Sequence, residues 1–282
     1  MAISAGQPEL FLRNMPQKYL AATMVTPRPY LPISHLFLFF GVPWRMRPLF
    51  RPSPFLLSCL LFLICVASML ASPAAEAAPA RERFVLAFGD SLTAGYGLKS
   101  SESFPARLEG LLRDEGHRVR VHNAGVSGDT TTGGRARLNR VLKGLKRKPD
   151  LVIVELGAND MLMGHNPKVT EANLDAMLSE LKARGIPVIL AGMFDTTSLG
   201  FSYFDQFNAI YPRVAKRHGA TLYPFFMKDV MLNKALLLKD RVHPNAQGVK
   251  VIAKNILPTI RAELLRQPAP KPKPSVVSSG VG

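Results

Sequence analysis

The sequence predicts an α/β domain with a mainly parallel five-stranded sheet between two layers of helices. From Arg83 onward, short apolar runs alternate with longer stretches whose apolar residues recur at helical spacing. Alternation of this kind is typical of a parallel sheet with helices on both faces. One run, DLVIVELG at 150–157, is almost continuously apolar, as expected for a strand that is covered on both sides. About 185 residues are enough for one well-buried core.

Strands and helices are expected in alternation along this domain. The strands are expected at 84–88, 118–125, 150–157, 186–192 and 220–226, and the helices at 104–115, 132–146, 170–184, 203–218 and 244–265. The helix over 170–184 should end near Gly185. The last helix should begin at Pro244, because proline suits the first helical position, and His243 would then lie at a helix start.

A segment before the domain has the pattern of a secretory signal peptide. Arg47 and Arg51 give a positive region, an uncharged core of 16 residues runs over 55–70, and AEA at 75–77 fits an A-x-A cleavage site. We therefore expect a cleaved signal peptide at 46–77 and a periplasmic or secreted protein. An uncleaved membrane anchor is the alternative, since the apolar core falls just short of a comfortable span.

The two ends of the chain are expected to lie outside the folded part. Residues 1–45 are rich in Pro and aromatics, and a signal peptide belongs at the terminus, so we expect translation to begin at Met46 and 1–45 to be a mis-assigned extension. The Pro-rich segment 267–282 cannot bury a core and is expected to be a disordered tail. The folded domain is therefore predicted at 78–266.

The charge and the cysteine content limit the function classes. The net charge is +16, and +12 remains without the residues before Ala78, from 30 basic and 18 acidic side chains. Much of the excess lies in RARLNRVLKGLKRK at 135–148, where the helical spacing of its apolar residues favours a solvated helix face over a nucleic-acid site. A weak contact with an anionic membrane surface and a monomeric state are further predictions.

Both cysteines, Cys59 and Cys65, lie in the predicted signal peptide, so the mature chain would have no disulfide and no thiol nucleophile.

Polar groups follow three of the predicted strands. The first ends in Gly89-Asp90-Ser91, the second in NAGVSGDTTTGG at 123–134, and the third in GAND at 157–160. Asp240 stands three residues before His243, so a Ser, a His and an Asp could reach the same edge of the sheet. Each signal alone is weak, but together and in this order they make coincidence improbable. The glycine-rich SGDTTTGG could suggest a phosphate-binding loop, but it lacks the lysine of a P-loop.

These blocks resemble those of the SGNH, or GDSL, hydrolase family. The match covers residue 84 to about 265, with GDSL at 89–92, Gly128, GAND, and DRVH at 240–243. Within that family the chain is most similar to the periplasmic multifunctional thioesterase/lysophospholipase/arylesterase group. The resemblance implies the family's flavodoxin-like three-layer fold. The serine is not on a G-x-S-x-G elbow, because position 93 is Thr.

The resemblance also implies a role for each site residue. It implies Ser91 as nucleophile, His243 as general base and Asp240 as the group that orients His243. A serine hydroxyl needs such a base, held in one tautomer by a third group. The implied oxyanion hole consists of the backbone N–H groups of Ser91 and Gly128 and the side-chain amide of Asn159, which can donate where a carboxylate cannot.

Substrate contacts are predicted from the residues after Asn159. Met161, Leu162 and Met163 correspond to a mobile, substrate-sensing loop in the resembling group, and flexible methionines suit a variable acyl chain. Aromatic residues in 193–207 could line an apolar groove at the same edge. No cluster has metal-ligand spacing, so we expect no metal and no cofactor. The remaining polar candidates are interpreted as turn and capping residues (Asp90, Asp129, Asp160) or as structural and surface histidines (His117, His122, His165, His218).

The sequence therefore predicts an exported, cofactor-independent serine hydrolase of carboxylic esters and thioesters. A carbohydrate O-acetyl esterase of the cell envelope would use the same residues. It is disfavoured because the mature chain would have no tryptophan to stack on a sugar. Trp44, the single tryptophan, precedes the signal peptide. A non-catalytic module that binds acyl lipids or envelope polymer is the alternative outside the enzymes, and the complete set of site residues argues against it.

Overall fold

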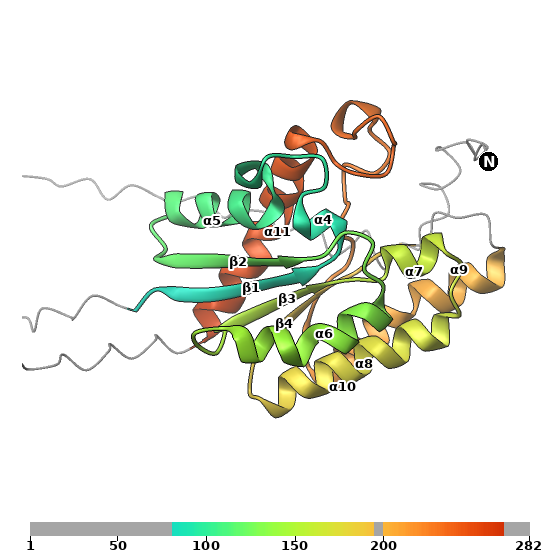
Figure 1. Ribbon diagram of the computed structural model, residues 1–282, viewed down its shortest axis with the longest axis horizontal. Helices are drawn as coiled ribbons and strands as arrows, with labels where there is room; N and C mark the ends of the chain where they lie inside the picture. The colour runs from blue at the N-terminus through green and yellow to red at the C-terminus, as the bar shows by residue number, and fades with distance from the viewer. Residues whose placement is uncertain (1–80, 195–199, 268–282) are drawn as a thin grey trace, which may run out of the picture. The chain divides into compact units, whose positions relative to one another are not determined.

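The predicted α/β class is confirmed by a computed structural model, which describes residues 81–194 and 200–267 (Figure 1). The sheet has five parallel strands in the order β2-β1-β3-β4-β5. Helices α5 and α11 pack together on one face, and α6, α8 and α10 form the layer on the other face. The predicted signal peptide and the predicted tail beyond Gln267 lie outside the described residues.

The elements follow the predicted alternation closely. The strands are β1 (Arg83–Gly89), β2 (Val119–Gly125), β3 (Leu151–Glu155), β4 (Val188–Ala191) and β5 (Thr221–Tyr223). The helices are α4 (Ser91–Ala94), η2 (Ser100–Glu102), α5 (Phe104–Asp114), α6 (Thr131–Gly144), α7 (Ala158–Leu162), α8 (Pro167–Ala183), α9 (Phe201–Asn208), α10 (Ile210–His218), η3 (Lys234–Leu236) and α11 (Ala246–Arg266). No helix in these ranges is long and apolar enough to cross a membrane.

The strand order locates the functional edge of the sheet. The chain runs outward from β1 to β2 on one side and then returns to β3 on the other side of β1. Ligands of open parallel sheets bind where the order reverses in this way, beyond the carboxyl ends of the strands. Strands β1 and β3 are largely buried, so the turns that follow them start from a rigid core. These turns carry Ser91 and Asn159.

Several predicted boundaries were wrong, each for a local reason. The last helix begins at Ala246 and not at Pro244, because the side chain of Asn245 accepts the N–H groups of the first turn and Pro244 pairs in a bridge with Leu237. Helix α8 begins before the predicted residue 170, because Asn166 caps it and Pro167 takes its first position. The predicted helix over 203–218 is two helices, α9 and α10.

Strand β2 lies at the edge of the sheet, and two side chains of α5 cover its free backbone groups. The Glu109 carboxylate accepts the Val121 N–H at 2.7 Å, and the Arg113 guanidinium donates to the Val119 carbonyl at 2.9 Å. The two covering side chains are themselves an ion pair at 3.0 Å. Part of this edge is therefore not free to pair with another strand.

Candidate active site

Ser91 and His243 come from opposite ends of the domain and meet at the carboxyl edge of the sheet. The His243 Nε2 lies 2.9 Å from the Ser91 Oγ, so the predicted approach of hydroxyl and imidazole is confirmed. On the other side of the ring, Nδ1 lies 2.8 Å from Asp240 Oδ2. This chain of contacts can take the serine proton onto Nε2 while Asp240 holds the ring in one tautomer.

The Asp240 carboxylate is itself held by the backbone around it. Its Oδ1 accepts the N–H groups of Val242 and His243, each at 3.0 Å. Partial burial favours the neutral acid, but these N–H groups and the imidazole outweigh it and keep the pKa of Asp240 below its ordinary value. His243 does not lie at a helix start, as the sequence had suggested, because α11 begins three residues later. Asp240 is therefore the charged group that acts directly on this ring.

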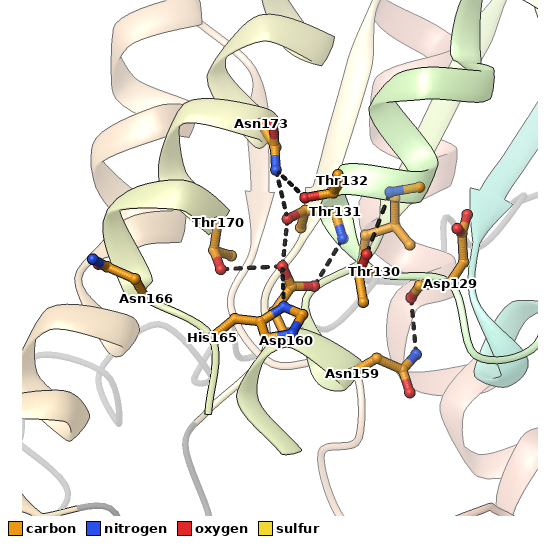
Figure 2. A network of polar contacts seen from close by, with 12 residues as sticks. Asp129, Thr130, Thr131, Thr132, Asn159, Asp160, His165, Asn166, Thr170 and Asn173 are labelled. Atoms are coloured by element: carbon orange, nitrogen blue, oxygen red, sulfur yellow. Dashed lines mark hydrogen bonds and ion pairs between the residues drawn. The ribbon is translucent and has the colours of Figure 1, made fainter. Parts of the chain in front are cut away.

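Asp90 connects the nucleophile to the predicted oxyanion hole. Its Oδ1 caps α4 by accepting the Leu92 N–H at 2.9 Å, which confirms the capping role expected for it. Its Oδ2 accepts from the Asn159 amide at 3.2 Å. The second N–H of that amide donates to the Asp129 carbonyl at 2.9 Å (Figure 2). Because both N–H groups are engaged, a substrate oxygen would have to take one of them over.

Two buried carboxyl groups lie directly behind Ser91. Burial is the main reason that the pKa of Asp90 rises to about 7, with the charges of Asp129 and Asp160 adding to it. Glu155 is fully buried, and burial together with the charge of Asp90 raises its pKa well above the ordinary value. The buried position therefore favours the uncharged form of Glu155.

The contacts of Glu155 lead to the helix of the nucleophile. Its Oε2 accepts the Thr93 hydroxyl at 2.6 Å, two residues beyond Ser91 in α4. Its Oε1 has no hydrogen-bond partner among the described residues. Glu155 was not among the residues predicted for the site. A lone glutamate inside an apolar, doubly covered strand was the available signal, because burying a carboxyl group is costly.

Arg137 ties the β2–α6 loop, which contains Gly128, to the end of β1. Its Nε donates to Asp129 at 2.6 Å, and its two terminal nitrogens donate to the carbonyls of Ala124 and Gly89, each at 2.9 Å. Asp129 is thus the partner of a buried guanidinium and not a capping residue. The expected solvated face of the basic helix holds for Arg140, Lys143 and other exposed members of the run, but not for Arg137.

Asp160 is the centre of a buried network that joins three helices (Figure 2). Its two carboxylate oxygens accept the backbone N–H of Thr131 at 2.8 Å, the hydroxyl of Thr131 at 2.5 Å and the hydroxyl of Thr170 at 3.2 Å. Asn173 extends the network from α8 by donating to Thr131 and Thr132. Asp160 does not cap its own helix α7; it accepts an N–H in the first turn of α6, whose N-cap residue is Thr130.

The three predicted substrate contacts separate in the structure. Leu162 and Met163 are 48% and 58% exposed at the end of α7, whereas Met161 is 6% exposed and packs in the core. Of the aromatic residues in 193–207, Phe207 is fully buried in the core. A groove of about 630 Å³ lies along α5 and β2, and its lining includes none of Ser91, Asn159 and His243.

Tyr96 is a site residue that the sequence analysis missed. Its half-exposed ring lies over the imidazole of His243, with the ring centroids 4.3 Å apart and the planes tilted by 34°. Gly95 and Gly97 flank it with φ values of 86° and 70°, which residues with a Cβ rarely adopt. A Cβ at Gly95 would also lie 2.7 Å from the Cβ of Ser103. These two glycines thus form the tight turn that presents Tyr96 to His243.

Two other described histidines have acidic neighbours of their own. His218 contacts Asp175 at 2.8 Å, a partner that the sequence did not reveal, and His165 stands 3.9 Å from Asp160. In residues 81–194 and 200–267, no group of three His, Cys, Asp or Glu side chains is placed to hold a metal ion.

Comparisons with known proteins identify the family of this domain. A model of the GDSL-like lipase/acylhydrolase family matches residues 87–251, a span that contains Ser91, Asn159 and His243. An arylesterase of Vibrio mimicus is 39% identical to this chain over 169 residues, which are 60% of this chain and 84% of the arylesterase. The thioesterase 1/protease 1/lysophospholipase L1 of Escherichia coli (strain K12) is 39% identical over 170 residues, which are 60% of this chain and 79% of the relative.

A solved structure extends the likeness to the whole fold. AlinE4, an esterase of the SGNH-hydrolase family, is 46% identical and superposes with a TM-score of 0.56. The match covers 67% of this chain and 98% of AlinE4. The described domain therefore corresponds to nearly the full length of that esterase.

Proposed function

Because the chain belongs to the GDSL-like lipase/acylhydrolase family, we propose that it hydrolyses carboxylic esters and thioesters by way of an acyl-enzyme on Ser91. The single observation that carries the assignment of the nucleophile is the 2.9 Å contact between the Ser91 Oγ and the His243 Nε2. A serine hydroxyl reacts when such a base can take its proton. The arylesterase and thioesterase names of the relatives support these substrate classes.

The reaction follows from the contacts around Ser91. His243 removes the serine proton as Oγ attacks the acyl carbon, and Asp240 stabilises the resulting imidazolium. The oxyanion is received by the backbone N–H groups of Ser91 and Gly128 and by the Asn159 amide. One such donor typically lowers the barrier by about 3 kcal/mol. His243 then protonates the leaving alcohol or thiol, and a water molecule, deprotonated by the same imidazole, releases the acid.

Replacing Ser91 by Ala tests the proposal. Turnover of p-nitrophenyl esters should fall by at least about 100-fold, and labelling by a fluorophosphonate probe should disappear. Ser101→Ala, at an exposed serine nearby, is the matched control and should change neither. Circular dichroism of the variant should match the parent, because Ser91 fills little space. Labelling and turnover that persist in a folded Ser91→Ala protein would disprove the role of Ser91.

A substrate panel separates the ester hydrolase from its rival. Acyl chains of increasing length, presented as esters and as thioesters, should be cleaved in preference to acetylated sugars. The exposed Leu162 and Met163 beside Asn159 support this preference, because they offer apolar surface to an acyl chain. A marked preference for acetylated sugars would favour the carbohydrate O-acetyl esterase instead.

We further propose that the protein acts in the periplasm or outside the cell as a monomer. The signal-like pattern at 46–77 supports export. N-terminal sequencing of the exported protein should therefore begin at Ala78. A membrane-bound product that retains residues 55–70 would show an anchor instead, and a precursor mass that includes residues 1–45 would exclude a start at Met46.

A further inference from the structure

Exposed apolar side chains gather at the active-site edge of the sheet. Nine large apolar side chains of the described residues are exposed, and five of them belong to turns that carry or adjoin the site. We call these five the apolar rim: Tyr96, Val126, Leu162, Met163 and Val242, which are between 42% and 58% exposed. Single exposed apolar residues are ordinary, but a gathering on one edge marks an interaction surface.

Each member of the rim is joined to the site by a short link. Tyr96 contacts the imidazole of His243, and Val242 is the neighbour of His243 in the chain. Leu162 and Met163 end the short helix α7, whose first turn holds Asn159. The backbone N–H of Val126 donates to the Gly89 carbonyl at 3.0 Å, which places it beside the end of β1. Figure 1 shows α4 and α7 at the same end of the sheet.

The outward-facing charges of the same turns are mainly positive. Lys99, Lys239 and Arg241 are exposed, and we call them the basic collar. Asp90 and Asp160, the acids of the turns after β1 and β3, are fully buried.

The remaining acids of the neighbouring turns have partners on the protein. Asp129 pairs with Arg137 and Asp240 with His243. The Glu102 carboxylate accepts the Lys99 N–H at 3.2 Å and lies 3.9 Å from the Arg107 guanidinium. A neutral imidazole leaves the charge of Asp240 in place, so this edge presents three basic side chains against one carboxylate, and its net charge is positive.

We infer that the apolar rim and the basic collar dock the active-site edge onto an anionic lipid surface, from which the enzyme takes acyl-ester substrates. Apolar side chains surrounded by Lys and Arg suit the boundary between acyl chains and phosphate headgroups. Tyr96 also suits this boundary, because its ring is apolar and its hydroxyl is polar. The choice of substrate rests on the proposed hydrolase function, whereas the docking does not.

The test measures binding without turnover. The exported protein with Ser91→Ala is floated with vesicles of phosphatidylcholine and with vesicles of equal parts phosphatidylcholine and phosphatidylglycerol. It should bind the anionic vesicles at least about tenfold more tightly, since each basic residue near an anionic surface adds to the affinity. All variants share one N-terminus, so any contribution of the residues before 81 is common to them.

Two variants in this background remove the two parts of the surface. Leu162→Ser with Met163→Ser should weaken binding to the anionic vesicles several-fold, because the apolar contact is lost. Lys239→Gln with Arg241→Gln should weaken it about tenfold or more and remove the preference for phosphatidylglycerol. Thermal unfolding measured for each variant shows whether the fold is retained.

Matched controls come from other surfaces of the same molecule. Leu265 is 70% exposed near the end of α11. The nearby Gln267 carbonyl accepts from Arg83 at the start of β1, so Leu265 lies at the opposite edge of the sheet from the site. Leu265→Ser should leave binding unchanged. Arg140→Gln with Lys143→Gln, on the exposed face of α6, should weaken it much less than the collar variant.

The outcomes divide the docking from the chemistry. Equal binding to both vesicle types, or a loss in the control variants as large as in the rim and collar variants, would overturn the docking. Vesicle binding that follows the rim and collar in a protein without esterase activity would leave the docking standing and refute the proposed function. Hydrolysis of soluble esters by a protein that fails to bind vesicles would support the proposed function and refute the docking.

Discussion

At the scale of single residues, the feature that most distinguishes this site is the buried acid Glu155 behind the nucleophile. Glu155 is inaccessible to solvent and ends β3, the central strand of the sheet, where a negative charge would have no water around it. Its contact with the Thr93 hydroxyl connects it to the helix that carries Ser91. A neutral carboxyl group can occupy this place, but its ionised form would add a second charge beside Asp90.

The raised pKa of Glu155 predicts a specific pH dependence of stability. Its folded-state pKa lies above the unfolded value of about 4.3. The stabilising contribution is therefore complete below about pH 4 and is lost as the pH rises through the folded pKa. Asp90, with its pKa of about 7, also stabilises the fold at low pH, and this contribution is lost as the pH rises to neutral. Glu155→Gln keeps the shape without the ionisation, so it should reduce the fall in Tm between pH 5 and pH 8 by a few degrees, roughly.

The measurement is thermal unfolding of the parent and the variant across that pH range. Glu180→Gln, at a partly exposed helix position, should leave the slope as it is. A slope for Glu155→Gln that equals the parent's would mean that Glu155 is ionised in the folded protein.

The sequence revealed the residues of this site that stand in short polar blocks and missed those that only burial makes special. Ser91, Asn159 and His243 follow strand ends or lie in a recognisable motif, so their chain positions indicated where they would meet. Arg137 stands in a run of basic residues that mostly face solvent, and nothing in the run shows which one turns inward. That is decided by the rotation of α6 over the end of β1, a tertiary property.

At the scale of elements, the short helix α7 is held in place by hydrogen bonds from α6 and α8. The carboxylate of Asp160 accepts three hydrogen bonds from α6 and α8, and its neighbour in α7 is Asn159 (Figure 2). The network therefore fixes the position of the amide that is proposed to receive the oxyanion. A helix of five residues has little stability of its own, so these tertiary contacts decide where it lies.

Changing this network should affect both stability and turnover. Asp160→Asn turns one acceptor oxygen into a donor and should lower the free energy of unfolding by about 2–3 kcal/mol. Because Asn159 would shift, kcat should fall more than KM changes. Thr170→Val removes a single hydrogen bond and should cost about 1 kcal/mol, with kcat little changed. Urea unfolding and ester kinetics check both variants, and an Asp160→Asn enzyme with unaltered kcat would separate the network from catalysis.

Periodicity predicted which helices exist, but capping decided where they start. The apolar pattern of the last helix extends back to Pro244, yet Asn245 supplies the side-chain oxygen that accepts the first free N–H groups. The short α7 and the division between α9 and α10 leave no clear periodic signal. Each of these helices has fewer than ten residues, which is too short a window for an apolar repeat to stand out.

At the scale of the whole molecule, alternation along the chain predicted the three layers, while the strand order appeared only in the structure. Apolar runs show that strands exist, but pairing between β1 and β3 depends on contacts far apart in the sequence. The same order leaves β2 at an edge, where Glu109 and Arg113 cover its backbone.

Removing that cover should promote self-association. Glu109→Ala with Arg113→Ala exposes the N–H of Val121 and the carbonyl of Val119 to pairing with another chain. Size-exclusion chromatography at increasing concentration should show more dimer or larger species than for the parent. Glu115→Ala with Arg261→Ala, which breaks an exposed ion pair between the end of α5 and α11, is the matched control. If both double variants elute like the parent, edge cover is not what keeps the chains apart.

The separation of Ser91 and His243 along the chain also matters while the protein is being made. They are 152 residues apart, so at about 5–20 residues per second the nucleophile leaves the ribosome roughly 8 to 30 seconds before its base. Over that interval the nascent chain carries a hydroxyl with nothing to activate it. The protein is thus synthesised in an inert form, and its reactivity begins only when the final loop arrives.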